Sequence, residues 1–446
     1  FGQAPQRGLP QAISPSSVTT QTFQTKYGED FDYGRPPHSG SIPLALLHEV
    51  FGEFIEDVQS CTPNARDNQH MLKLCEKMIQ IHESEATRAL SFREIWEEFI
   101  PYPLEAGIIG GSSFATDGHI RRNRYFLVIT EAKRELEGMK PDPLIQAAMY
   151  YLQALQPFKN SNGLFPCLLI YYAGMLSESI KEDPKITVIL GSYIGFAGAV
   201  WNEKIQIEVL TPFYPLQGNP HQRNIRLQVA RALAATRRAV TSLETHYNNL
   251  VIPPSVEENI IKPVSFPYRT YYESQGEVSQ RQRIKFTYQK RIFDNRLMFI
   301  AKNTAGRLLF VKFTQRYSAT AHKHCAEQGI APTLYAAEKL PGVYRDTETR
   351  TQLHTKIKRA TEILHSGGFV HGDLRGANVM VRKNWKENTA EQDLGVMLLD
   401  FDWAGEAGKV RYPANLNCQL YRPEGVEDGV VITVDHDVDM VDHILD

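Results

Sequence analysis

The chain has 446 residues, of which 42% are hydrophobic and 22% charged, and its formal net charge is −2. Since a single hydrophobic core stops growing at roughly 250–300 residues, this length predicts about two or three domains. No apolar run approaches the ~20 residues that a membrane-spanning helix needs, and the near-neutral charge indicates no general preference for nucleic acid. The five cysteines are widely spaced, which fits reduced thiols in the cytosol or nucleus and argues against a structural zinc site.

The first 250 residues change character three times along the chain. Residues 1–42 are rich in Pro, Gln, Ser, Thr and Gly, which predicts a disordered tail or a loosely docked arm. From residue 43 to about 101, spaced apolar residues without strand alternation predict several helices. Residues 105–210 carry strand-like runs around one helix at 142–156, which is typical of an α/β domain. The runs are FLVIT, PCLLIYY, KITVILG and KIQIEVL.

A long amphipathic helix is predicted at 221–250, where apolar residues recur every three to four positions. It closes a first domain that we place at 43–250. Residues 251–280 contain four prolines and little periodicity, which predicts a linker. A second domain is expected at 281–446, so the fold class predicted is α/β multidomain.

The first group of residues that suggests chemistry is Asp117, Glu131 and Lys133. Phosphodiester hydrolysis needs a divalent cation bound by hard oxygens, an activated water, and positive charge near the developing oxyanion. Alternation along the strand FLVITEAK places Glu131 and Lys133 on one face. Asp117, on the preceding strand of a predicted hairpin, joins them if the register brings the strand ends level. By itself a Glu-x-Lys at a strand end is more often a solvated ion pair.

Two helices add support for a site at this position. Gln146 and Tyr150 share one face of the helix that follows, because they are four residues apart. Upstream, Glu85 lies on the apolar stripe of a predicted helix, and an inward carboxylate requires a partner. A shifted register would put Glu83 or Glu76 in its place.

These residues resemble the restriction-endonuclease-like, or PD-(D/E)xK, nucleases, which use a helix acid, an Asp, a Glu-x-Lys and, in recombination-type members, a Gln-x-x-x-Tyr. The resemblance implies an α/β/α domain in which Asp117 and Glu131 bind Mg²⁺ or Mn²⁺. It also implies that Lys133 orients water or stabilises charge. Gln146 would position the DNA backbone, Tyr150 would contact nucleic acid, and Glu85 would be the catalytic helix acid.

Arginines supply candidate contacts to DNA phosphates, which give affinity without sequence preference. We expect four of them to lie beside the site: Arg121, Arg122, Arg124 and Arg134. The predicted helix at 221–250 carries five more against a single acid, Glu244; a solvated helix face is the commoner reason for such a pattern. These five are Arg223, Arg226, Arg231, Arg237 and Arg238.

The second group of motifs lies in HGDLRGANV and LLDFDWAG. Phosphoryl transfer needs an Asp near the acceptor hydroxyl, an Asn five residues later for a metal, and a further metal-binding Asp after a hydrophobic strand. Asp373, Asn378 and Asp400 match this spacing, and Lys312 in LLFVKF matches the strand lysine that contacts ATP phosphates. The resemblance is to protein kinases, and it implies a compact bilobal α+β domain. Asp437, in DHDVDMVDHIL, resembles the start of the buried helix of that fold.

Several features depart from the kinase pattern. No G-x-G-x-x-G precedes Lys312. His322 stands where the helix acid that pairs with this lysine is expected, and the first acid after Lys312 is Glu327. Gly372 replaces the Arg of HRD, and Asp402 replaces the Gly of DFG. A degenerate, scaffolding domain is therefore weighed equally with an active one, in which ATP would be the cofactor.

The order of the two domains resembles the fungal crinkler-type effectors over about residues 45–446. The resemblance implies a Mg²⁺-dependent endonuclease that cuts double-stranded DNA in a nucleus, often that of a host cell, and causes cell death. The kinase-like domain would regulate cleavage or assist DNA binding. No folded header domain is evident in 1–42, which puts secretion in doubt.

Two other interpretations remain open from the sequence. One is an active protein kinase, with a protein substrate, whose first domain only binds that substrate or nucleic acid. The other is a binding scaffold in which both sites are remnants. A membrane partner is not expected, and homodimerisation is left open.

Overall fold

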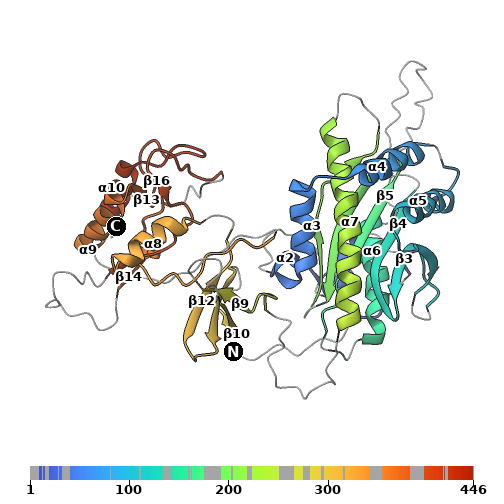
Figure 1. The fold of residues 1–446 in the computed structure, drawn as a ribbon, viewed down its shortest axis with the longest axis horizontal. Coiled ribbons are helices and arrows are strands. Elements are labelled where there is room, and N and C mark those ends of the chain that lie inside the picture. Colours follow the sequence, from blue (N-terminus) through green and yellow to red (C-terminus); the bar gives the residue numbers. More distant parts are fainter. Residues whose placement is uncertain are drawn as a thin grey trace. The chain divides into compact units, whose positions relative to one another are not determined.

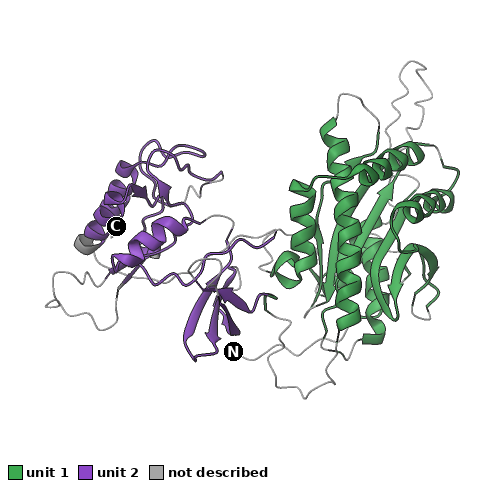
Figure 2. Cartoon of the chain, in the orientation of Figure 1, with its two compact units in different colours: residues 1–268 green, residues 269–446 purple. Residues whose placement is uncertain are grey.

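The chain folds as two compact units, residues 1–268 and residues 269–446, which Figure 2 shows in different colours. In this computed structural model the residues described are 10–12, 14–15, 20–28, 30–32, 41–80, 82–109, 112–133, 142–158, 161, 163–174, 192–201, 204–217, 223–250, 266–274, 282–292, 296–314, 317–341, 354–381, 396–414, 416 and 420–444. Both units combine helices with sheets, so the predicted mixed α/β multidomain class is confirmed. Among the described residues, no helix is both long enough and apolar enough to cross a membrane.

An eight-stranded sheet forms the centre of the first unit, in the order β1-β7-β6-β5-β4-β3-β2 with β8 beside β6. Its strands are β1 (Phe31–Asp32), β2 (Glu105–Ile108), β3 (Ala115–Arg122), β4 (Tyr125–Lys133), β5 (Cys167–Ala173), β6 (Tyr193–Trp201), β7 (Ile205–Val209) and β8 (Tyr214–Pro215). β4 and β5 run parallel, joined through a helix, whereas β3 and β4 form an antiparallel hairpin. Every residue of β4 and β5 is buried, as expected for central strands covered on both faces.

Helices pack around this sheet. They are α1 (Thr20–Tyr27), α2 (Leu44–Leu47), α3 (Glu49–Ser60), α4 (Ala65–Met78), α5 (Glu85–Phe99), α6 (Pro143–Leu155), a 3₁₀ turn (Gln156–Phe158) and α7 (Arg223–Asn249). Capping boxes at Asn64 and Ser84 begin α4 and α5. α6 packs on β4 and β5, and α7 lies along the sheet with α3 beside it (Figure 1). The predicted helices at 43–101, 142–156 and 221–250 are thus present.

Of the two alternatives for residues 1–42, a docked arm and not a free tail describes the part that the structure shows. α1 and β1 belong to the first unit, and β1 pairs with β7 in parallel. Phe23, Tyr27 and Phe31 are all buried and pack ring against ring. The segment is poor in aliphatic residues, but these aromatic side chains supply enough apolar area to pack it onto the first unit.

The second unit begins with an antiparallel sheet in the order β12-β11-β10-β9. Its strands are β9 (Tyr271–Glu273), β10 (Arg283–Arg291), β11 (Met298–Asn303) and β12 (Leu308–Lys312). Because β9 pairs with β10, residues 271–273 belong to this unit and not to the predicted linker 251–280, whose residues 251–265 and 275–280 lie outside the described ranges. Gly306, with φ +80°, forms the β11–β12 turn.

A helical part follows the sheet of the second unit. It contains α8 (Ala319–Glu327), α9 (His354–Ser366), α10 (Val434–Asp442), a 3₁₀ turn (Gly376–Asn378) and two small sheets, β13 (Phe369–Val370) with β16 (Gly405–Glu406) and β14 (Val379–Val381) with β15 (Val396–Leu398). Side chains from these helices and strands share one hydrophobic core, which includes Ile357, Leu364, Leu398 and Phe401. The loops that leave this core carry the HGD and DFD sequences.

Candidate functional site

The β3–β4 hairpin brings Asp117 level with Glu131. Its register pairs Gly118 with Thr130, so one residue further along the ladder Asp117 stands opposite Glu131. One carboxylate oxygen of Asp117, Oδ2, accepts a hydrogen bond from the main-chain N–H of Ala132 at 2.8 Å. The condition on which the sequence-based site depended is therefore met.

Lys133 joins the acids of β4 and α5. Its Nζ lies 2.8 Å from Glu131 Oε1 and 3.5 Å from Glu85 Oε2. Glu85 occupies the first turn of α5 and is 42% exposed, so it is less inward than its helical stripe predicted. Glu83 and Glu76 are exposed, and of the three candidate helix acids we therefore take Glu85 as the one that belongs to the group.

Burial and mutual charge shift the pKa values of all three residues, Asp117, Glu131 and Lys133. Burial raises the pKa of Glu131 well above its usual value, and the nearby Asp117 carboxylate raises it further, against the effect of Lys133. Burial also raises the pKa of Asp117, opposed by its bond from Ala132 and by Lys133. For Lys133, burial acts to lower the pKa, but Glu131, Glu85 and Asp117 outweigh it and the pKa is raised. Three acids thus surround one lysine, and a further cation would relieve the excess negative charge.

Two buried oxygens at this position have no hydrogen-bond partner among the described residues. They are Oε2 of Glu131 and Oε1 of Gln146, whose Nε2 donates to Tyr150 Oη at 3.1 Å. An unpaired buried oxygen costs about 1–3 kcal/mol, which a bound ion or water would offset. Hard carboxylate oxygens of this kind fit Mg²⁺ or Mn²⁺.

The side chains alone do not complete a metal shell. Within the described ranges there is no group of three or more His, Cys, Asp or Glu placed to hold a metal ion. Magnesium sites commonly use one or two carboxylates, with waters and substrate phosphate in the other positions. Asp117 and Glu131 fit such an incomplete protein shell.

Arg93 also contacts the site and was not predicted. It lies on α5, about two turns after Glu85, and its Nη1 donates to the main-chain oxygen of Asp117. Its positive charge lowers the pKa of Asp117, though less than burial raises it. The signal that could have found it is its position on the same helix as the candidate acid, one residue after the buried Phe92.

For the nuclease activity that the sequence resemblance implies, we predict that Arg93→Gln reduces DNA cleavage about 10- to 100-fold with a smaller effect on stability. The side chain fixes the start of β3 and adds positive charge close to Asp117, and removing a positioning contact of this kind typically costs that much in rate. Single-turnover plasmid nicking would measure the rate, with thermal unfolding as the companion measurement. Arg66→Gln, on the exposed surface of α4, is the matched control, and equal rates for both variants would remove Arg93 from the site.

The predicted phosphate contacts of the hairpin are not beside this site. Arg121, Arg122 and Arg124 lie at its turn, whereas Asp117 and Glu131 lie toward the opposite strand ends; four residues at ~3.4 Å each put Arg121 about 14 Å along β3 from Asp117. Arg122 pairs with Glu244 at 2.5 Å. Arg124 lies over the rings of Tyr125 and Phe158, at 5.4 and 5.1 Å from their centroids. Arg134 lies outside the described residues.

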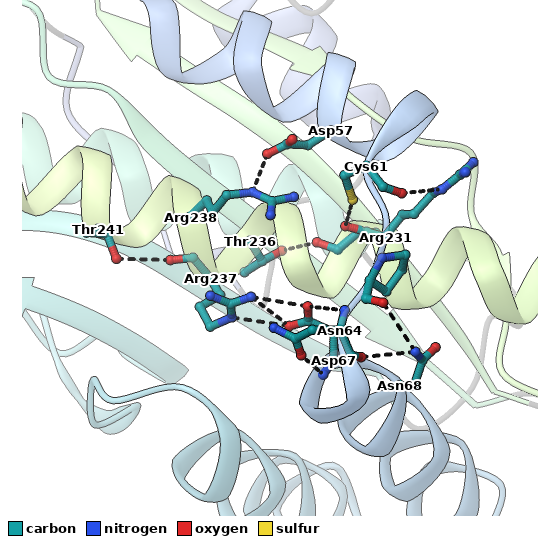
Figure 3. Close-up of polar contacts among 12 residues, drawn as sticks. Asp57, Cys61, Asn64, Asp67, Asn68, Arg231, Thr236, Arg237, Arg238 and Thr241 are labelled. Carbon is teal, nitrogen blue, oxygen red and sulfur yellow. Dashed lines mark hydrogen bonds and ion pairs between the residues drawn. The ribbon is translucent and has the colours of Figure 1, made fainter.

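Three arginines of α7 hold neighbouring helices instead of presenting a free basic face (Figure 3). Arg237 makes a two-pronged contact with the buried Asp67, at 2.9 and 3.2 Å to Oδ1 and 3.1 Å to Oδ2. Arg238 pairs with Asp57 at 2.6 Å, and Arg231 donates to the main-chain oxygens of Cys61 and Gln59. These contacts join α7 to α3 and α4, so all three side chains are engaged within the first unit, although Arg238 is also exposed to solvent.

For Arg237→Gln we expect a loss of about 2 kcal/mol in the unfolding free energy of the first unit and no change in the DNA affinity that the sequence resemblance implies. The variant leaves the Asp67 carboxylate buried without its cation, and a buried hydrogen-bonding group left unpaired costs about 1–3 kcal/mol. Urea unfolding and fluorescence anisotropy with labelled DNA would measure the two quantities. The exposed Arg223, at the start of the same helix, supplies the control, and a weaker affinity at unchanged stability would contradict this assignment.

In the second unit, the predicted Asp373 and Asn378 lie together. Asn378 Nδ2 donates to both Asp373 Oδ2 and the Asp373 main-chain oxygen at 2.8 Å. Two arginines add ion pairs: Arg375 to Oδ2 at 3.0 Å and Arg422 to Oδ1 at 2.8 Å. Arg422, which was not predicted, lies over the ring of Trp403 at 4.8 Å. Its approach from a segment 49 residues away in sequence leaves no local signal.

Lys312 and Asp400, also predicted, are in direct contact. Lys312 Nζ lies 2.8 Å from Asp400 Oδ1 and 2.8 Å from Asp402 Oδ1. Burial acts to raise the pKa of Asp400, but Lys312 outweighs it and lowers the pKa. Asp400 has φ +64°, a conformation that costs a non-glycine residue energy and that is concentrated at functional sites.

Asp437, on α10, fixes the HGD turn through hydrogen bonds to its main chain. Its side chain is completely buried and accepts hydrogen bonds from the main-chain N–H groups of His371 and Gly372, at 2.6 and 2.7 Å. His365 Nε2 lies 3.0 Å from the same carboxylate. Gly372 has φ +78°, and a Cβ there would lie 2.6 Å from Ile432 Cδ1, so the Arg of an HRD sequence would be strained here and would displace the Ile432 side chain.

No family model matches this sequence, and no curated protein is similar enough to count as a relative. The geometry of these two residue groups is therefore the basis for a functional proposal.

Proposed function

We propose that the first unit is a restriction-endonuclease-like nuclease that hydrolyses double-stranded DNA with Mg²⁺ or Mn²⁺. The observation that carries the proposal is the convergence of Asp117, Glu131 and Lys133 at one end of the β3–β4 hairpin, with a buried Glu131 oxygen unpaired. An ion pair on a solvated strand end would leave both side chains exposed, whereas Glu131 is 1% and Lys133 6% exposed. Buried ionisable groups with perturbed pKa values are concentrated at functional sites.

Each residue then has a defined part. Asp117 and Glu131 would hold the metal, which when bound activates water and stabilises negative charge on phosphate. Lys133 stabilises charge on the scissile phosphate, and Glu85 keeps the lysine ammonium beside Glu131. Gln146, held by Tyr150, presents its unpaired oxygen to the same region and orients the water or the DNA backbone.

The test is plasmid nicking by the purified full chain. We expect supercoiled DNA to become nicked and linear in Mg²⁺ or Mn²⁺, to stay intact in EDTA, and to be cut again when the metal is restored. Duplex RNA and single-stranded DNA of equal length serve as competitors that define the substrate. Intact plasmid in both metals would overturn the proposal.

For the second unit we propose a kinase-like nucleotide site. The observations in its favour are the contacts of Lys312 with Asp400 and of Asn378 with Asp373, two pairs whose residue types resemble those used in phosphoryl transfer. Both oxygens of Asp373 are already engaged by arginines, which favours a regulatory domain over an active kinase. If the unit is instead an active kinase, ATP hydrolysis is lost in Asp400→Ala while DNA stays intact in Mg²⁺; silence in both assays favours a scaffold.

The order of these two sites supports the wider proposal of a crinkler-type effector that acts on nuclear DNA and causes cell death. Expression in cultured cells tests it: DNA breaks and loss of viability are expected with the native chain and not with Lys133→Ala. Viable cells with a nuclear, well-expressed native chain would overturn this part alone.

A further inference from the structure

The helix that should supply a partner for Lys312 does not do so. α8 contains a single acid, Glu327, which is 61% exposed and lies 3.9 Å from Lys323. His322, at the position expected for the acid, stacks on Phe401 at 5.0 Å with an interplanar angle of 6° and bonds through Nε2 to the Pro332 oxygen at 2.8 Å. Its burial lowers its pKa to about 4, so the ring is neutral at physiological pH. α8 thus supports Phe401.

The next acid along the chain is also committed elsewhere. Glu338 pairs with Arg269 and accepts a hydrogen bond from the main-chain N–H of Glu273 at 2.7 Å. It therefore fixes β9 and the segment before it. Among the described residues 319–341, both acids, Glu327 and Glu338, are therefore engaged away from Lys312.

Asp402 provides that carboxylate. Lys312 is only 8% exposed, and a buried ammonium requires a counter-charge. Asp400 and Asp402 both contact it at 2.8 Å, but their situations differ. The second oxygen of Asp402 accepts a hydrogen bond from Thr314 Oγ1 at 2.9 Å, two residues after β12 ends at Lys312. Lys312 and Thr314 therefore bind both oxygens of Asp402.

The two acids also differ in what a ligand would do to them. In phosphoryl-transfer sites the Asp after the hydrophobic strand turns to a divalent ion when nucleotide binds. Asp400 would then leave Lys312, whereas Asp402 would stay as its counter-charge. Without Asp402 the lysine would be buried beside a carboxylate shared with metal and would lose its fixed direction.

We propose that Asp402 is the positioning residue of the second unit, which holds Lys312 toward the phosphates of a nucleotide in place of a helix acid. The Asp at the third position of DFD is then a functional replacement and not a sign of decay. The ligand class rests on the nucleotide site proposed above, whereas the anchoring of Lys312 does not.

The first experiment measures the anchor without any nucleotide. Amine labelling of the full chain, read by mass spectrometry, gives the acylation rate of Lys312. A neighbouring carboxylate keeps an amine charged and unreactive, so we expect Asp402→Asn and Asp402→Gly to raise the rate about 10-fold. Thr314→Val removes the hydrogen bond to Asp402 but leaves the Asp402 charge, so it should raise the acylation rate of Lys312 by only about 3-fold. Glu327→Gln should leave it unchanged.

The second experiment is calorimetric titration of the same variants with MgATP. Asp402→Gly restores the DFG sequence. If Asp402 is only a sign of a degenerate kinase, this variant should bind MgATP more tightly, whereas if Asp402 positions Lys312, it should bind MgATP at least about 10-fold more weakly. Unchanged labelling in both Asp402 variants, or an increase in Glu327→Gln instead, overturns the anchor. If the native chain does not bind MgATP, the nucleotide proposal fails, and the labelling rates still decide whether Asp402 holds Lys312. A cooperative thermal unfolding transition like that of the native chain shows that each variant is folded.

Discussion

Glu131→Gln is expected to reduce plasmid nicking by at least about 1,000-fold while the first unit stays folded. The variant keeps the shape of the side chain but removes the charge that would bind a cation, and metal ligation contributes several kcal/mol to transition-state stabilisation. Burial already disfavours the charged Glu131 carboxylate, and Glu85, 3.5 Å from Lys133 Nζ, and Asp117 remain as counter-charges to the lysine, so the neutral amide should not lower the unfolding free energy by more than about 1 kcal/mol. Nicking rates and urea unfolding of the same preparations measure both quantities.

Lys133→Ala should show a comparable loss of nicking. Unlike Glu131→Gln, Lys133→Ala leaves the Glu131 carboxylate buried without a cation, so only Lys133→Ala is expected to lower the unfolding free energy clearly. Glu94→Gln, on the exposed face of α5, and Lys204→Ala, on the exposed surface, are matched controls for charge and residue type. Nicking at the native rate in either site variant would exclude the proposed catalytic group.

Asp437→Ala is expected to destabilise the second unit by about 3–5 kcal/mol. The variant leaves the N–H groups of His371 and Gly372 buried without an acceptor, and each such loss costs about 1–3 kcal/mol. His365 also loses its partner. Hydrogen exchange followed by mass spectrometry should show faster exchange in peptides from α10 and from the HGD turn.

The control for this variant is Asp435→Ala, in the first turn of the same helix and exposed, where a loss below about 1 kcal/mol is expected. Peptides of the first unit should exchange at native rates in both variants. If Asp437→Ala and Asp435→Ala gave equal protection throughout, the carboxylate would not hold the turn.

The nuclease-like group could be found from sequence because its geometry is local. Strand alternation puts Glu131 and Lys133 on one face, and a tight hairpin leaves few registers for Asp117. The same local logic fails for Arg121, Arg122 and Arg124. Closeness in sequence to Glu131 suggested closeness in space, but an extended strand carries them away to the turn.

Other features depend on partners that are distant in sequence. β6 was not predicted because Gly and Ala have low strand propensity, yet a Cβ on Gly195 or Gly198 would lie 2.5 Å from the rings of Tyr171 or Phe51. Close packing therefore selected residues that local rules disfavour. The predicted strand at 185–191 lies outside the described residues. Arg422 likewise has a meaning only beside Asp373.

The arginines of α7 also bear on the order of events during synthesis. Arg237 and Arg238 reach acids that precede them by 170 and 181 residues, so α3 and α4 leave the ribosome long before their partners. Contacts of such long sequence separation form late and slow folding. At about 5–20 residues per second, Asp67 and Asp57 wait on the order of ten seconds or more for α7. Until α7 is synthesised, α3 and α4 therefore lack the helix on which they pack.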